Sequence, residues 1–129
     1  MDAVWFGQLT VTAFFAIAFL QSAADKWMDS AGNIEFFGSH FADSPLGNLV
    51  PMMFWTITVL ESLAGVVSGI GTIQILFGMG TGIAVWGLVF STISLLCLFF
   101  GQRLAKDYAG AAVVAAYFAV VILGLILFG

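Results

Sequence analysis

The sequence predicts an all-α integral membrane protein, in which residues 1–129 form a single domain. This domain is a four-transmembrane-helix bundle with a short interfacial amphipathic helix between the first and second spans. Two observations predict this fold class. Of the 129 residues, 62% are hydrophobic and only 8% are charged, whereas a soluble domain carries roughly a quarter charged residues. In addition, four long segments are almost free of charge, and the charged residues gather between them.

Composition also excludes several other classes of protein. A net charge of −4 provides no basic patch of the kind that binds nucleic acid. Cys97 is the only cysteine. Disulfides, paired-cysteine redox motifs and thiolate metal sites are therefore excluded within one chain. The partner that this composition requires is the lipid bilayer.

The four uncharged segments define the expected spans. The first, Val4–Ala24, would extend roughly 30 Å as a helix, which is enough to cross a bilayer. It is not expected to be a cleaved signal peptide, because no basic residue precedes it and Asp25-Lys26 follows it in place of a cleavage site. The other spans run from about Leu46 or Pro51 to Gly71, from Gly80 to Phe100 and from Ala109 to Phe128.

Local signals indicate where these helices begin and end. Ser44-Pro45 is typical of a helix cap followed by a first-turn proline, and Pro51 is a second possible start. Gly69 and Gly71 are candidates for the end of the second span. Asp107 is placed to cap the fourth, where its negative charge suits the positive end of the helix dipole.

The connection after the first span contains the amphipathic helix. Asn33 is expected to cap a helix from Ile34 to about Ala42, with Ile34, Phe37 and Phe41 on one face. Such a helix lies at the membrane surface, either as a lid over the bundle or among the lipid headgroups. The second arrangement is the commoner.

Glu61 is the foremost candidate for a functional residue. Counted from Pro51, it lies about 15 Å into the second span, near the middle of the bilayer. An ionisable side chain at that depth is costly and by default marks a functional site. We expect it to be protonated unless a cation pairs with it. A structural carboxyl that fastens two helices together is an equally good interpretation.

The other candidates for a ligand site lie near one end of the expected bundle. Lys26 either extends outward to the membrane surface or reaches down toward Glu61. Arg103, four residues before Asp107, is suited to a lipid phosphate or to an anionic ligand. The full set of expected ligand-binding residues is Gln21, Asp25, Lys26, Glu61, Arg103, Lys106 and Asp107.

His40 is a possible polar site on the interfacial helix. One histidine with scattered carboxylates nearby is a poor metal-ligand set, so we expect hydrogen bonding there and no metal site. No Ser-His-Asp pattern and no haem-type histidine pair is present in the sequence. We therefore expect no catalytic residues and no independent catalytic activity.

Membrane orientation follows from the basic residues. Lys26, Arg103 and Lys106 all fall in the first and third connections. The positive-inside rule then places these connections in the cytoplasm and both termini outside.

Seven short motifs occur in order along the chain: Asp25-Lys26, Gly32-Asn33, His40-Phe41, Ser44-Pro45, Leu60-Glu61, Gly101-Gln102-Arg103 and Lys106 to Gly110. With them the chain resembles the DoxX family of bacterial four-helix membrane proteins over nearly its whole length, and most closely the Bacteroidetes type. Lys26 and Glu61 match the lysine and glutamate of that family's first and second helices. The resemblance implies a multi-pass protein of the bacterial inner (cytoplasmic) membrane.

The family includes the DoxD-like subunit of thiosulfate:quinone oxidoreductase, and other members are associated with redox complexes. The resemblance therefore favours a small accessory subunit, structural or stabilising, of a larger membrane redox or respiratory assembly with other membrane subunits. The alternative is a quinone- or lipid-binding subunit of a membrane oxidoreductase, with a bound quinone or lipid and with no cofactor held by the chain alone. A small-molecule transporter ranks third, because charges gather on only one side of the bundle. The paired cysteines of redox-associated relatives are missing, which argues against thiol chemistry.

Overall fold

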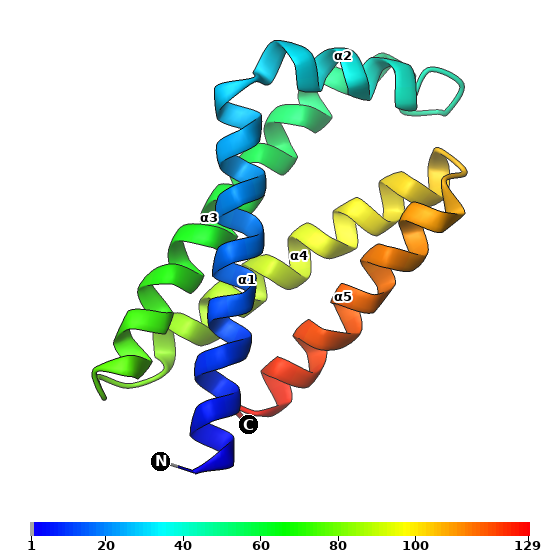
Figure 1. The fold of residues 1–129 in the computed structure, drawn as a ribbon. Helices are drawn as coiled ribbons and strands as arrows, with labels where there is room; N and C mark the ends of the chain where they lie inside the picture. The colour runs from blue at the N-terminus through cyan, green and yellow to red at the C-terminus, as the bar shows by residue number, and fades with distance from the viewer. Residues whose placement is uncertain (1) are drawn as a thin grey trace.

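The computed structural model describes residues 2–129, and within them the chain forms four long helices and one shorter helix (Figure 1). The long helices are α1 (Ala3–Met28), α3 (Val50–Leu76), α4 (Gly82–Leu104) and α5 (Tyr108–Ile126). Between α1 and α3 lie α2 (Ser30–His40) and a 3-10 turn, η1 (Gly47–Leu49). All four long helices are long and apolar enough to cross a membrane. The predicted all-helical fold with four spans is therefore confirmed.

The helices form an open bundle. α1 packs along α3, α3 along α4, and α4 along α5. Both termini lie at one end, and α2 runs across the other end (Figure 1). Toward α2, the pair α4 and α5 diverges from the pair α1 and α3 (Figure 1). The two helix pairs are therefore farther apart at the α2 end than at the end with the termini (Figure 1).

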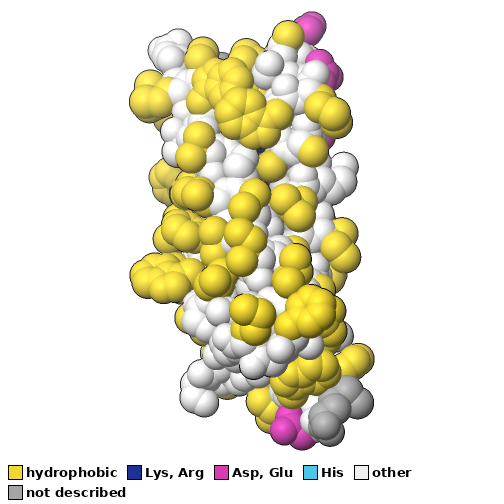
Figure 2. All heavy atoms as spheres, turned by 90° about the vertical axis from the view of Figure 1, so that its left-hand side faces the viewer, with side chains coloured by type: hydrophobic (Ala, Val, Ile, Leu, Met, Phe, Trp, Pro, Cys, Tyr) yellow, Lys and Arg dark blue, Asp and Glu magenta, His cyan; other side chains and the backbone are white. Residues whose placement is uncertain are grey.

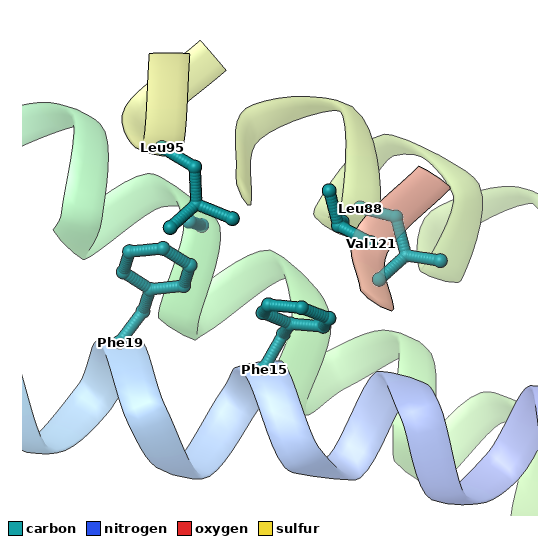
Figure 3. Packing of buried hydrophobic residues seen from close by; sticks show 6 residues of the cluster. Phe15, Phe19, Leu88, Leu95 and Val121 are labelled. Carbon is teal, nitrogen blue, oxygen red and sulfur yellow. The ribbon is translucent and has the colours of Figure 1, made fainter. Parts of the chain in front are cut away.

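The core lies where the four long helices are closest. Phe15 and Phe19 of α1 face Leu88 and Leu95 of α4, and Val121 of α5 joins them (Figure 3). These side chains are almost completely buried. Since lipid supplies little hydrophobic driving force between helices, such close van der Waals packing is what holds the spans together.

The outer surface is apolar along its length. Figure 2 shows hydrophobic side chains spread over the whole face, with acidic side chains only near its two ends. Large side chains such as Ile17, Trp86 and Ile126 are more than half exposed. This surface suits a lipid environment, as expected of a multi-pass membrane protein.

The amphipathic helix forms as predicted, but its bounds differ. α2 begins at Ser30, and the carboxylate of Asp29 caps it by accepting a hydrogen bond from the Gly32 amide at 3.2 Å. Asn33 does not cap α2. Its side-chain Nδ2 donates a hydrogen bond to the Asp29 carbonyl at 2.8 Å, at the C-terminal end of α1. On the inner face of α2 Phe37 is half-buried, and Phe41 just beyond it is buried.

Two other predicted helix limits are wrong. Ser44 does not start the second span, because its hydroxyl accepts from the Leu46 amide within a turn, and α3 begins only at Val50 with Pro51 in its first turn. Gly69 and Gly71 do not end α3, which continues to Leu76. Asp107 caps α5 as predicted, accepting from the Gly110 amide at 2.9 Å.

Candidate functional site

A buried ion pair joins α1 to α3. Lys26 Nζ lies 2.8 Å from Glu61 Oε1, and only 11% and 3% of the two side chains are exposed. Ser22 completes the cluster: its hydroxyl donates to Glu61 Oε2 at 2.8 Å and accepts from Lys26 Nζ at 2.9 Å. Of the two interpretations of Lys26, the structure therefore shows the one in which it reaches down to Glu61.

Local sequence explains how this cluster is built. Ser22 and Lys26 are four residues apart on α1, so they share one face of the helix. One residue further on, Trp27 Nε1 donates to Ser62 Oγ at 2.9 Å, next to Glu61 on α3. Two adjacent polar contacts thus hold the last turn of α1 against the middle of α3.

Glu61 depends on this pairing. Its Oε1 accepts no hydrogen bond from any other group within residues 2–129, so the Lys26 ammonium is its compensation. A buried carboxylate without a cation would be strongly disfavoured in this environment. The cation that the sequence analysis allowed for is therefore present, and it is Lys26.

A cavity of about 510 Å³ lies beside this cluster, below α2. We call it the α2 cavity. Phe36 and Phe37 form its roof, Met53 and Ile57 of α3 form one wall, and Leu98 of α4 lies opposite. The ring of Phe37 packs edge-on against Phe54 of α3, with centroids 5.6 Å apart, which anchors the roof. Of the two arrangements expected for this helix, α2 therefore shows the less common one, in which it covers the end of the bundle as a lid.

Polar side chains line the α2 cavity at two places. Lys26 comes from the end of α1, whereas His40, Gln102 and Asp107 come from the end of α2, the end of α4 and the cap of α5. His40 Nε2 lies 2.6 Å from Gln102 Oε1 and 3.7 Å from Asp107 Oδ2. Since an amide oxygen only accepts hydrogen bonds, His40 Nε2 carries the proton in this contact. The contact joins the end of α2 to the end of α4.

Hydrogen-bond donors remain for a ligand in the α2 cavity. The Lys26 ammonium has three N–H groups, and its two contacts within residues 2–129 leave one over. The Gln102 amide also carries an NH₂ group that its contact with His40 does not use. The site is therefore suited to a ligand group with acceptor oxygens.

The residues predicted for a ligand site are divided among different places. Lys26, Asp107 and His40 line the α2 cavity. Gln21 and Glu61 line a second, smaller space between α1 and α5. Asp25 is exposed and receives the Asn33 amide at 3.4 Å. Arg103 and Lys106 are exposed, line neither cavity, and the Arg103 guanidinium lies 4.7 Å from the ring centroid of Tyr108.

Sequence reasoning missed four features of the site: Ser22, Gln102, the aromatic roof and Met53. Ser22 could have been found, because its spacing of four residues from Lys26 places both on one helix face. Gln102 and the aromatic roof could not, because their role depends on where α2 crosses the bundle. Met53 likewise gains its role only from the space that the diverging helices leave.

Within residues 2–129, no three His, Cys, Asp or Glu side chains are grouped as ligands for a metal ion. Cys97 lies on the wall of the α2 cavity with no second thiol in the chain. Comparison of the chain with protein-family models, with curated proteins and with solved structures finds no match.

Proposed function

We propose that this protein binds the polar head of an amphiphilic small molecule, a quinone or a lipid, in the α2 cavity. The observation that carries the proposal is the cavity itself: about 510 Å³ with aromatic and apolar walls and a few polar side chains on its lining. Small-molecule sites typically have roughly 300–1,000 Å³ and a few polar groups on otherwise apolar walls. The unused donors of Lys26 and Gln102 match the carbonyl oxygens of a quinone or the oxygens of a lipid head.

The resemblance to the DoxX family gives this binding a setting. We propose that the chain is a DoxX-like subunit of a membrane redox assembly in the bacterial inner membrane. Its part there is to hold the ligand, while the oxidation or reduction takes place on other subunits. A transporter is less well supported, because the charged and hydrogen-bonding groups of the cavity gather at one end of the bundle.

An accessory subunit that only stabilises a larger complex is the second candidate. The observation that favours it is the closed cluster of Ser22, Lys26 and Glu61, in which the ionisable residue deepest in the bundle is satisfied by partners from the same chain. Under this proposal Glu61 fastens α1 to α3 and has no ligand.

Binding to the purified protein tests the first candidate. Protein purified in mild detergent is extracted for quinones and lipids, and a quinone with a short tail is titrated into it. We expect stoichiometric binding. Gln102→Leu should weaken binding about tenfold, because a carbonyl oxygen then loses its donor.

The matched control is Gln74→Leu, which makes the same change at the opposite end of the bundle, where Gln74 Oε1 accepts from the Ile83 amide. It should leave binding unchanged. If the wild-type protein binds no quinone or lipid but co-purifies with other membrane subunits, the second candidate replaces the first.

A further inference from the structure

A second cavity, of about 290 Å³, lies between α1, α4 and α5. We call it the α1–α5 cavity. Gln21, Ser22 and Glu61 line its part nearest α2, and Phe15 and Ala18 line the part deeper in the bundle. From Ser22 to Phe15 it follows α1 for about 10 Å toward the centre of the molecule. Its walls therefore change from polar to apolar with depth.

The two cavities are adjacent. Leu98 of α4 and Val114 of α5 line both of them. In addition, Lys26 on the wall of the α2 cavity contacts Ser22 and Glu61 on the wall of the α1–α5 cavity. A ligand with its head in one cavity and its tail in the other would lie beside the ion pair.

α1 and α5 are in contact along a seam beside this cavity. The seam is closed toward the end of the bundle with the termini and open toward the α2 end. At the terminal end, Gln8 Nε2 donates to the Leu127 carbonyl at 2.9 Å. Further along, the rings of Phe14 and Tyr117 lie 5.9 Å apart. Beyond these rings the two helices diverge toward the α2 end (Figure 1), and the α1–α5 cavity occupies the space between them.

We infer that the α1–α5 cavity holds the flexible apolar tail of the ligand, and that the ligand reaches its site sideways from the bilayer through the seam between α1 and α5. This inference rests on the proposed function of the α2 cavity. The ligand class is an amphiphile with a compact acceptor-bearing head and one linear tail. Both a prenylated quinone and a single-chain lipid have this shape.

Polarity supports the lateral path. In a bilayer, an amphiphile keeps its head at the surface and its tail toward the centre. The combined cavities have the same order, with Lys26, His40 and Gln102 at the α2 end and Phe15 at depth. The ligand can therefore move in from the lipid without turning over and without exposing its tail to water.

Filling the α1–α5 cavity tests the inference. Ala18 lines the α1–α5 cavity but not the α2 cavity, whereas Val114 lines both. Ala18→Trp and Val114→Trp are compared in purified protein with two quinones that share a head, one with a long isoprenoid tail and one with a very short tail. We expect Ala18→Trp to lower affinity for the long-tailed quinone about tenfold, as overpacking an occupied site does. Affinity for the short-tailed quinone should not change.

The controls are the neighbouring residues on the lipid-facing surface. Ile17 and Val113 are 70% and 56% exposed, so Ile17→Trp and Val113→Trp add the same ring outside the cavity and should bind both quinones as the wild type does. A single-chain fatty acid is tested as a second ligand in the same binding experiment. If it displaces the long-tailed quinone from the wild type and itself loses affinity in Ala18→Trp, a lipid is the source of the tail.

Three results would overturn the inference. Unchanged affinity for the long-tailed quinone in both cavity variants would show that the tail does not occupy this cavity. The proposed head site in the α2 cavity would not be affected by that result. Equal losses for both quinones in Ala18→Trp would show damage to the head site rather than exclusion of a tail. A wild-type protein that binds no quinone and no fatty acid would overturn the proposed function together with this inference.

Discussion

Glu61 and Lys26 come from different helices, and their pairing is what makes both tolerable inside the bundle. Only 3% and 11% of their side chains are exposed, and they are 2.8 Å apart. Removing one partner from a buried pair leaves the other charge uncompensated, whereas replacing both with apolar residues is often nearly neutral. The pair therefore determines how α1 packs against α3. One N–H of the Lys26 ammonium is bound to neither Glu61 nor Ser22.

The first prediction concerns this pair. Glu61→Gln should destabilise the protein by about 3–5 kcal/mol, because Lys26 then keeps a buried charge without a counter-ion. The double change Lys26→Met with Glu61→Leu should be less destabilising than the single change. Thermal unfolding in mild detergent measures both.

The control for the single change is Glu35→Gln, which alters an exposed carboxylate on α2 and should leave the unfolding temperature unchanged. If the double variant is less stable than Glu61→Gln, the two side chains do not compensate each other and the interpretation of the pair is wrong.

At the scale of the helices, close approach depends on glycine at a few crossings. A Cβ on Gly87 of α4 would lie 2.7 Å from the Ser68 Cα of α3, and a Cβ on Gly65 would lie 2.7 Å from the Leu20 amide nitrogen of α1. In both cases the neighbour is backbone, which cannot move without separating the helices. By contrast, a Cβ on Gly69 would meet only the end of the Leu20 side chain at 3.8 Å.

Gly87→Ala should therefore lower stability by about 1–3 kcal/mol, the usual cost of overpacking a tight contact. Gly38→Ala is the matched control, because a Cβ there meets nothing within 4 Å and alanine favours a helix by up to about 1 kcal/mol. Unfolding temperatures in detergent compare the two. Equal stability of Gly87→Ala and the wild type would mean that α3 and α4 are not in close contact.

At the scale of the whole molecule, four spans place the two termini and the turn between α3 and α4 on one side of the membrane. α2 and the turn between α4 and α5 lie on the other side. The basic residues Lys26, Arg103 and Lys106 all belong to the α2 side, so the positive-inside rule predicts that this side faces the cytoplasm.

Single cysteines in a Cys97→Ser background test this topology. Met79 lies in the turn between α3 and α4, and Asp43 lies after α2; both are exposed. In intact spheroplasts, a membrane-impermeant maleimide should label Met79→Cys and should label Asp43→Cys only after lysis. Labelling of both from the same side would contradict the four-span topology. The reverse pattern would keep the four spans and invert the orientation.

The class of the protein could be predicted from sequence alone because a bilayer imposes simple requirements. A spanning helix needs a long apolar run, and a buried charge needs a reason. The four spans and the choice of Glu61 as a candidate follow from those two requirements. The cap at Asp107 and the amphipathic character of α2 follow from the helix dipole and from helical spacing. The start of α2 and the end of α3 did not follow, because the Asn33 side chain bonds back to the Asp29 carbonyl and Gly71 packs against the backbone of Ala84 within a continuing helix.

Only the tertiary structure decided where the cavities lie. Gln102 and His40 are 62 positions apart, and their contact exists because α2 crosses the open end of the bundle. In the same way, Ala18 and Val114 line one space because α1 and α5 diverge beyond Phe14 and Tyr117. Hydrophobic periodicity assigns each helix an inner face, but it contains no information about the angle between helices. That angle is determined by which small residues allow backbones to approach, and here it leaves the bundle open at the end where its polar side chains gather.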